Sequence, residues 1–260
     1  MNVREITQIL EEQSPLSYAL EWDNVGLLAG DLDREVNKIY IALDASDAAV
    51  DAAVEAGADM LLTHHPLIFK GIKKIVSKDF TGRRLIKLIS NHIAYYAMHT
   101  NFDVRGMADL SAAMLGLENT EVLDVTAVTD GREEGIGRTG TLMQPMSLEY
   151  CAEFVKAAFS LKQVTVFGEK NRLIKKAAIS PGSGKSEIAN AISRQADVLI
   201  TGDIGYHDGI DAAAAGLCII DAGHYGLEHI FIRYMKEYLE KHCEGVSILA
   251  QEISFPCFIV

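Results

Sequence analysis

The chain has 260 residues, 49% of them hydrophobic, and a net charge of −12, which fits one large or two modest globular domains and argues against general nucleic-acid binding. No apolar run reaches the roughly 20 residues of a membrane span, and the first residues lack a signal peptide's apolar core, so we expect a cytoplasmic protein without a membrane partner. Four scattered cysteines without CxxC spacing favour buried reduced thiols over disulfides or zinc–thiolate sites.

Short apolar runs alternate with amphipathic stretches in both halves of the chain. The runs, interpreted as strands, are 39–43, 58–63 and 93–98, and then 177–180, 197–201 and 217–221. The stretches, interpreted as helices, are 47–56 and 82–90, and then 186–194 and 208–215. This alternation is typical of parallel βαβ units with helices on the sheet faces. The sequence therefore predicts an α/β fold with a βαβαβ lobe in each half.

The two halves also repeat one sequence pattern. Residues 58–63 and 196–201 are the same apolar strand ending in the same threonine, 138 positions apart. The offset falls to 125 for the fragments 99–103 and 224–228, because the first copy carries about 13 more residues around 66–82. Each fragment places a histidine four residues ahead of a carboxylate. We interpret the two lobes as an internal duplication.

Histidines and carboxylates follow the ends of the predicted strands. They are His64, His65, His99, Asp103, Asp203, His224 and Glu228. Ligands of open α/β sheets gather beyond the carboxyl ends of the strands. If the two halves face each other, these side chains point to a common region. Imidazoles and carboxylates in this number indicate a metal centre.

Local spacing supports the strongest ligand candidates. His64 and His65 follow each other on an extended chain and reach one site only if the backbone turns, which Pro66 favours. His224 and Glu228 lie at the start of an amphipathic stretch, where an i, i+4 pair shares one helix face. The alternative for Glu228 is a simple interaction with the helix dipole.

Five ligands are too many for one tetrahedral zinc and suit two ions about 3.5–4 Å apart, with Asp103 and Glu228 as bridging carboxylates. Such ions lower the pKa of a bound water and polarise the bond that it attacks, which is the chemistry of hydrolysis. His99 is predicted to transfer a proton or to have a structural role. The alternative is that Asn101 and Asp103 cap a turn before a helix near 107–115.

Two further groups are candidate second-shell or substrate residues. Asp23 or Asn24 can orient a ligand histidine, or the segment can form an Asx-turn with Trp22, the only tryptophan, filling the core. Asp203 aligns with His65 in the repeat and is predicted to border the same cavity.

Three other segments have two interpretations each. Seven cations between Lys70 and Lys87 form either a rim for an anionic substrate or the solvated surface of a loop and helix. Residues 180–186 end like a P-loop but lack its first glycine, so they either bind phosphate or make a tight turn from strand to helix. Residues 135–140 satisfy GxGxxG, yet a strand is predicted at 139–143 where a helix is needed.

The ordered motifs resemble those of the NIF-three-like family, whose members are called GTP cyclohydrolase I type 2 homologues. The motifs span residues 21–228 and are Glu21–Leu27, Leu62–Leu67, His99–Asp103, Ile200–Asp203 and Gly223–Glu228. The resemblance implies a dinuclear metal site at His64, His65, Asp103, His224 and Glu228. It also implies two interlinked lobes with the site in the cleft between them, and a homohexamer built as a trimer of dimers. The resulting division is 1–116 for the first lobe, 117–172 for a connecting segment and 173–260 for the second lobe.

The predicted function is a dinuclear metal-dependent hydrolase that acts on a nucleotide or another phosphorylated small molecule, and the resemblance associates it with GTP cyclohydrolase activity. Two divalent ions, such as zinc, iron or manganese, are the predicted cofactors. The alternative is a non-enzymatic, metal-containing ring assembly or binding module.

Overall fold

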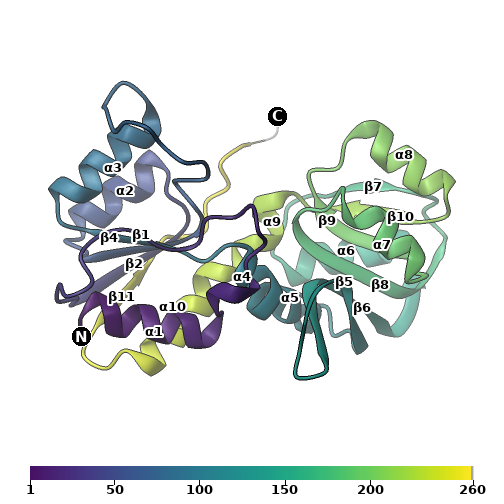
Figure 1. The fold of residues 1–260 in the computed structure, drawn as a ribbon. Coiled ribbons are helices and arrows are strands. Elements are labelled where there is room, and N and C mark those ends of the chain that lie inside the picture. Colours follow the sequence, from purple (N-terminus) through teal and green to yellow (C-terminus); the bar gives the residue numbers. More distant parts are fainter. Residues whose placement is uncertain (259) are drawn as a thin grey trace. The chain divides into compact units, whose positions relative to one another are not determined.

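The computed structural model describes residues 1–258 and 260, and its contacts divide the chain into two compact units (Figure 1). Unit 1 comprises Met1–Phe102 and His229–Ser254, and unit 2 comprises Asp103–Glu228 and Phe255–Val260. Every helix among the described residues is too short or too polar to cross a membrane.

Unit 1 is built on a five-stranded sheet in the order β1-β4-β3-β2-β11. Its strands are β1 (Gly26–Ala29), β2 (Lys38–Asp44), β3 (Met60–His65), β4 (Ala94–Ala97) and β11 (Ser247–Ala250). Its helices are α1 (Val3–Gln13), the 3-10 turn η1 (Leu16–Tyr18), α2 (Asp47–Glu55), α3 (Phe80–Ser90), α4 (Thr100–Phe102) and α10 (Ile230–His242). All neighbouring strands run parallel except β1, which is antiparallel to β4. Helices α2 and α3 cover one face of the sheet, and α1 and α10 cover the other (Figure 1).

The helices of unit 1 begin where the sequence supplies a cap. The Ser46 side chain accepts a hydrogen bond from the Ala49 backbone at the start of α2, and the Asp79 carboxylate accepts one from Gly82 at the start of α3. The apolar faces of both helices then pack on Leu61 and other buried side chains of the sheet. Burial of this apolar surface fixes the sheet whose strand ends carry the candidate site.

Unit 2 is built on a six-stranded sheet in the order β5-β6-β8-β9-β10-β7. Its strands are β5 (Glu118–Thr129), β6 (Arg132–Ser147), β7 (Thr165–Phe167), β8 (Leu173–Ser183), β9 (Val198–Gly202) and β10 (Cys218–Asp221). Its helices are the π-helix η2 (Asp103–Met107), α5 (Ala108–Met114), α6 (Leu148–Ala158), α7 (Glu187–Ser193), α8 (Tyr206–Ala214) and α9 (His224–Glu228). Strands β8, β9 and β10 run parallel, and β6 and β7 flank them in the antiparallel direction.

The predicted α/β class is confirmed, with the order β2-α2-β3-α3-β4 in unit 1 and β8-α7-β9-α8-β10 in unit 2. The same hydrogen bonds recur in both. The Asp59 carboxylate accepts from the backbone nitrogens of residues 37 and 38 at 2.8 and 3.0 Å, and Asp197 accepts from those of 175 and 176 at 2.8 and 2.9 Å. The two aspartates lie 138 positions apart, which is the offset of the sequence repeat.

One residue distinguishes the third strands of the two copies. Ala97 and Asp221 occupy equivalent positions in their strands and lie 124 positions apart, whereas His99 and His224 lie 125 apart. The second copy therefore holds one additional residue between strand and histidine. Gly223 lies in this turn with φ +75°, a conformation that glycine adopts without strain.

The unit boundaries at 102/103 and 228/229 differ from the predicted lobe limits at 116 and 173. Strand β11 pairs with β2, so the chain returns to the first sheet near its end. Residues 117–172, predicted as a connecting segment, supply β5, β6, α6 and β7, and β6 pairs with β8 in the second sheet. Both differences arise from strand pairings between distant parts of the chain, which local periodicity does not report.

Candidate metal centre

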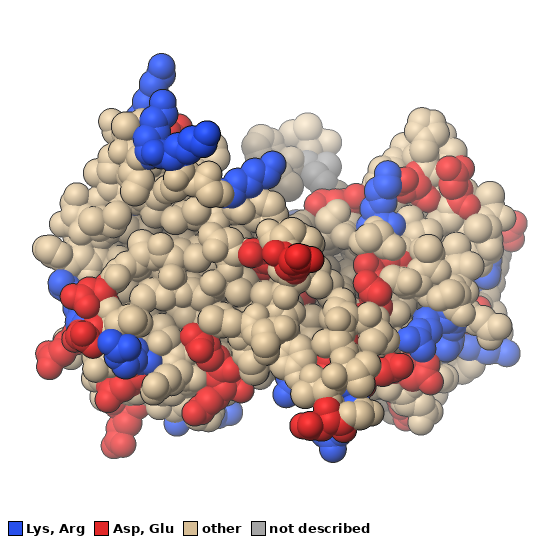
Figure 2. Space-filling view, viewed as in Figure 1, with Lys and Arg blue, Asp and Glu red and all other residues tan. Residues whose placement is uncertain are grey.

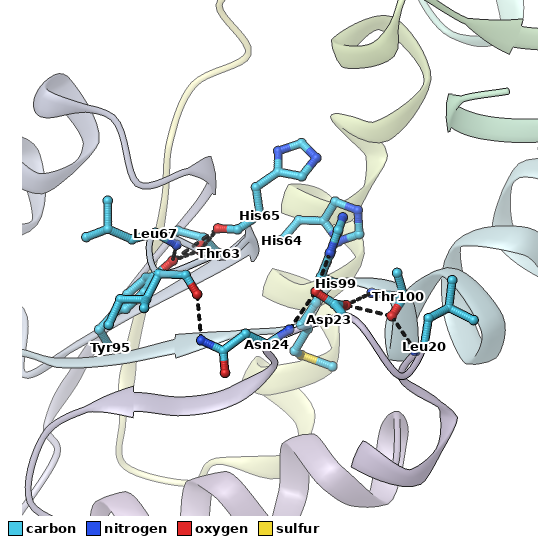
Figure 3. Close-up of polar contacts among 12 residues, drawn as sticks. Leu20, Asp23, Asn24, Thr63, His64, His65, Leu67, Tyr95, His99 and Thr100 are labelled. Carbon is cyan, nitrogen blue, oxygen red and sulfur yellow. Dashed lines mark hydrogen bonds and ion pairs between the residues drawn. The ribbon is translucent and has the colours of Figure 1, made fainter. Parts of the chain in front are cut away.

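Three histidines of unit 1 come together at one edge of its sheet. His64 and His65 end β3, and His99 follows the parallel neighbour β4 (Figure 3). The ring centroids of His64 lie 4.9 Å from those of His65 and 5.3 Å from those of His99. Each histidine offers a ring nitrogen within 4.8 Å of the other two. The predicted convergence of these strand ends is therefore observed within this unit.

Acceptor oxygens hold the Nδ1 atoms of the two histidines that end β3. The Nδ1 atom of His64 lies 2.6 Å from the backbone oxygen of Met98, and that of His65 lies 2.8 Å from the Asp44 carboxylate. A donor Nδ1–H leaves the Nε2 lone pair as the ligating atom, and a carboxylate partner raises the basicity of the imidazole. Both histidines therefore have the tautomer and support that metal ligands require.

Asp23 holds His99 in the same way. Its side chain is fully buried, lies 2.9 Å from Nδ1 of His99 and accepts bonds from the backbone and hydroxyl of Thr100 at 3.0 and 2.6 Å (Figure 3). Burial by itself would raise the pKa of Asp23, but the hydrogen bonds from His99 and Thr100 lower it to about 2. Because Asp23 is ionised at neutral pH, Nδ1 of His99 is the donor.

The other residues of the 21–24 segment have different roles. The Asn24 side chain donates to the backbone oxygen of Ile68 at 2.5 Å and so ties this segment to the loop after β3. The Trp22 side chain is 57% exposed, so the alternative in which it fills the core is wrong. Asp23 therefore orients a histidine, His99, whereas Asn24 holds the loop after β3.

In unit 2, short helix α9 carries a second set of candidate ligands. Nε2 of His224 lies 3.0 Å from the Glu228 carboxylate, and Nδ1 of His224 lies 2.8 Å from Asp203. Glu228 is only 2% exposed. Two atoms that bind one ion at about 2.1 Å each lie about 3 Å apart in common coordination geometries, so His224 and Glu228 fit a shared metal ion.

The glycine-rich stretch at the end of β8 packs closely against Glu228. A Cβ on Gly182, which has φ +81°, would lie 2.6 Å from a Glu228 carboxylate oxygen, and one on Gly184 would lie 1.8 Å from the hydroxyl of Thr201. Lys185 pairs with Asp208 at 3.0 Å. This packing supports a tight turn from strand to helix, because the glycines are needed to bring the backbone close to Glu228 and β9.

Asp103 is the first residue of the π-helix η2. The α5 helix that follows has Met107 at its N-cap and no side-chain hydrogen bond there. π-Helical turns are rare and occur frequently at functional sites. The GxGxxG stretch at 135–140 lies inside β6, and the strand continues to Ser147 where a dinucleotide-binding motif needs the start of a helix.

The cationic segment divides into two parts. Arg83 and Arg84 pair with Asp47 at 3.4 and 2.8 Å, and Lys87 pairs with Asp51, so these cations on α3 join it to α2. The loop before α3 carries the remaining exposed lysines Lys70, Lys73, Lys74 and Lys78. Figure 2 shows Lys and Arg side chains gathered on this part of unit 1. The cations on α3 therefore fit the interpretation as a solvated helix surface. The interpretation as a rim for an anionic substrate applies to the loop lysines.

Asp44 is a candidate site residue that the sequence interpretation missed. It ends β2, which is parallel to β3, and its register partner in the sheet is His65. The rule that site residues follow strand ends applies to Asp44 as it does to His65. The signal was therefore present, but an isolated aspartate after a strand is too common to stand out.

The chemistry of these candidate ligands fits divalent transition metals. Four imidazoles with Nδ1 held by oxygen, together with the Asp103 and Glu228 carboxylates, are the ligand types of zinc, iron and manganese sites. Within unit 1 the group is His64, His65 and His99, and within unit 2 His224 contacts Glu228. Metal ligation by the individual residues stays a prediction.

Comparison with known sequences gives a consistent assignment. A family model described as Duf34/NIF3 (NGG1p interacting factor 3) matches residues 1–255. A Clostridium acetobutylicum protein called GTP cyclohydrolase 1 type 2 homolog is 35% identical over 244 residues, which cover 92% of this chain and 90% of the relative. A Lactococcus lactis protein of the same name is 35% identical over 264 residues, which cover 99% of each chain.

Solved structures agree with the sequence relatives. A Bacillus cereus protein related to NIF3 matches with a TM-score of 0.91 at 28% identity and covers 100% of this chain and 99% of its own. Reduced HcgD from Methanocaldococcus jannaschii matches with a TM-score of 0.83 at 32% identity, with coverage of 97% and 98%. The resemblance predicted from the five motifs is confirmed, and the chain belongs to the Duf34/NIF3 family.

Proposed function

We propose that this protein is a dinuclear metal-dependent hydrolase whose ions are held by His64, His65, Asp103, His224 and Glu228. The main observation behind the proposal is that acceptor oxygens hold the Nδ1 atoms of the histidines. All four imidazoles of the candidate groups have an acceptor oxygen on Nδ1, and for His65, His99 and His224 that acceptor is a carboxylate. Metal-ligating histidines almost always have such an acceptor on the other ring nitrogen.

The two candidate carboxylates lie where the chain passes between the units. The chain passes from unit 1 to unit 2 between Phe102 and Asp103 and returns between Glu228 and His229. The two candidate bridging carboxylates are therefore the first and last residues of the long segment of unit 2.

The chain's own residues have distinct roles in the proposed reaction. Bound divalent ions supply an activated water and polarise the bond under attack. Asp44 and Asp203 hold Nδ1 of His65 and His224, so that each Nε2 lone pair is available for ligation. Asp23 holds Nδ1 of His99, and this leaves Nε2 of His99 to accept or return a proton near the reacting group.

The proposed substrate is a nucleotide or another phosphorylated small molecule. The exposed lysines at 70–78 offer positive charge to a phosphate. The relatives' name, GTP cyclohydrolase 1 type 2 homolog, points to the same class of compound. Zinc, iron and manganese all suit mixed imidazole and carboxylate ligands.

The test is elemental analysis of protein purified without added metal. We expect about two ions per chain in the parent and a sharp fall in Asp103→Ala and Glu228→Ala, because each variant loses one of the proposed ligands. Glu240→Ala, an exposed acid on α10, is the matched control and should retain the parent's content. Less than about half an ion per chain, with no rise after incubation with zinc, manganese or iron, would exclude this function.

Phosphoester cleavage is measured next, with p-nitrophenyl phosphate and GTP as probes. Turnover that is lost on chelation and restored by metal supports the hydrolase. Full metal content without turnover favours the second candidate, a non-enzymatic metal-containing assembly, for which the family resemblance supplies a homohexamer. Sedimentation analysis tests that assembly, since six chains of 28.4 kDa have a mass of about 170 kDa.

A further inference from the structure

Two aromatic rings of unit 1 lie in contact on its surface. The side chains of Trp22 and Phe69 are 57% and 45% exposed, and their ring centroids are 5.6 Å apart at an interplanar angle of 48°. Single exposed apolar residues are ordinary, but an exposed tryptophan beside an exposed phenylalanine leaves a large aromatic surface in water. We call these two residues the aromatic platform.

The aromatic platform adjoins the candidate metal centre. The His99 ring lies 6.0 Å from Trp22 and 6.3 Å from Phe69, with an edge-on geometry in both cases. His99 in turn shares its group of candidate ligands with His64 and His65. A molecule that lies on the platform therefore lies beside the histidines of unit 1.

Hydrogen bonds on both loops hold the platform in place. The backbone nitrogen of Asp23 donates to Leu20 at 2.9 Å, and the Asp23 carboxylate is fixed by His99 and Thr100. The second loop is fixed because the backbone nitrogen of Leu67 donates to the Tyr95 hydroxyl at 2.8 Å (Figure 3).

The two loops are also tied to each other. The Asn24 side chain, two residues after Trp22, donates to the backbone oxygen of Ile68, the residue before Phe69. The rings are thus exposed on loops with fixed backbones. Binding to a preorganised surface avoids the entropy cost of ordering it.

The chemistry of this surface selects one kind of ligand. Aromatic side chains on a fixed backbone bind flat heteroaromatic rings by stacking, and they do so for any nucleobase because every base has a π-face. Lys70 follows Phe69 directly, and Lys73 and Lys74 lie in the same exposed loop. A ring on the platform and a phosphate near these lysines are the two parts of a nucleotide.

We propose that Trp22 and Phe69 are specificity-determining residues that stack the planar ring of a nucleotide-like substrate beside His99. The proposal rests on the proposed hydrolase function and narrows its substrate class, because a phosphorylated sugar or polyol has no ring to stack. Neither residue takes part in bond cleavage. Their role is to bind and orient the substrate.

Trp22 is the only tryptophan, so its fluorescence reports on the platform directly. The probes are GMP and AMP, with ribose 5-phosphate as the ring-free control, each added to metal-loaded and to chelator-treated protein. We expect saturable quenching by the two nucleotides and none by ribose 5-phosphate.

Variants are measured by equilibrium dialysis of GMP, since Trp22→Leu removes the fluorophore. We expect roughly a 5- to 150-fold loss of affinity in Trp22→Leu and in Phe69→Leu, which is the range for the loss of one stacking contact. Trp22→Phe retains an aromatic face and should recover most of the affinity. Tyr150→Leu removes an exposed aromatic ring from α6 in unit 2 and should bind as the parent does.

The outcomes distinguish a failure of the platform proposal from a failure of the hydrolase proposal. Trp22-dependent GMP binding, in a parent protein that contains less than about half an ion per chain and takes up none on incubation with zinc, manganese or iron, would support the platform and contradict the hydrolase. About two ions per chain, with equal GMP affinity in parent and Trp22→Leu, would overturn the platform and leave the hydrolase intact. Absence of GMP and AMP binding to metal-loaded parent would also overturn the platform.

Discussion

Carboxylates on histidine Nδ1 atoms are the dominant feature at the scale of single residues. Asp23, Asp44 and Asp203 each contact one histidine, and each comes from a segment other than that of its partner. A carboxylate in this position fixes the ring and strengthens Nε2 as a ligand. The effect of its removal on metal binding therefore measures whether the histidine is a ligand.

Asp44 provides the test. Asp44→Ala is expected to lower metal affinity roughly 10- to 100-fold, because His65 loses its orienting partner. Competition with a chromogenic chelator measures the change. Asp51→Ala removes a comparably exposed acid that pairs with Lys87 and should leave the affinity at the parent value. Equal affinities in all three proteins would show that His65 binds no metal.

Asp23 predicts a pH dependence of stability. Its pKa of about 2 in the folded protein lies below the ordinary value of 3.8. The stabilisation is therefore complete above pH 4 and is lost as the pH falls through 2, and its upper bound is about 2 kcal/mol. In urea unfolding, Asp23→Asn should be less stable than the parent at pH 6, and this difference should shrink at pH 2.5. A difference that stays constant over this range would contradict the assigned pKa.

At the scale of elements, the two βαβαβ segments use equivalent aspartates to join their first and second strands. Asp59 precedes β3 and binds the backbone at the start of β2, and Asp197 does the same for β9 and β8. Each carboxylate satisfies two backbone N–H groups, and hydrogen bonds to a charged group contribute more than neutral ones. Equivalent positions in the repeat should therefore carry equivalent energies.

Substitution of these aspartates tests the equivalence. Asp59→Ala and Asp197→Ala are each expected to lower the free energy of unfolding by about 1.5–3 kcal/mol, since each leaves two N–H groups without their acceptor. Chemical denaturation measures both values, with exposed Asp211→Ala as the control. If only one of the two variants lost stability, the two copies would share a sequence pattern but not the energetic role of this aspartate.

At the scale of the whole molecule, the proposed metal binding would be coupled to stability. Any ligand that binds only the folded state stabilises it, by about 2.7 kcal/mol at a concentration 100 times its dissociation constant. For a chain of this size that corresponds to a shift of the melting temperature by roughly 5 to 10 °C. Chelation should therefore lower the melting temperature of the native protein.

Calorimetry and circular dichroism check this expectation together. Chelator should lower the melting temperature while the far-ultraviolet spectrum at 25 °C keeps its native shape, because the sheets of both units have apolar cores of their own. Glu228→Ala should melt at one temperature with and without chelator. Complete unfolding by chelator at 25 °C would instead indicate a structural metal, in line with the non-enzymatic candidate.

Strand ends and ligand types were predictable because their signals are local. The apolar runs at 58–63 and 197–201 match β3 and β9 to within two residues, and both belong to the sequence repeat. The exposure of Trp22 was not predictable, since it depends on where the loop after β3 lies. Asp23 and Asn24 were both candidates to orient a histidine. The sequence did not decide between them, because Asp23 and His99 lie 76 residues apart.

By itself, the sequence determined the α/β class, the repeat, the family and the set of histidines and carboxylates, because periodicity and motif spacing act over a few residues. Only the tertiary structure decided that β11 joins the first sheet, that residues 117–172 build part of the second, and that Asp44 supports His65. These features depend on pairings between distant segments. Such pairings are selected by the packing of whole sheets, and no short stretch of sequence specifies them.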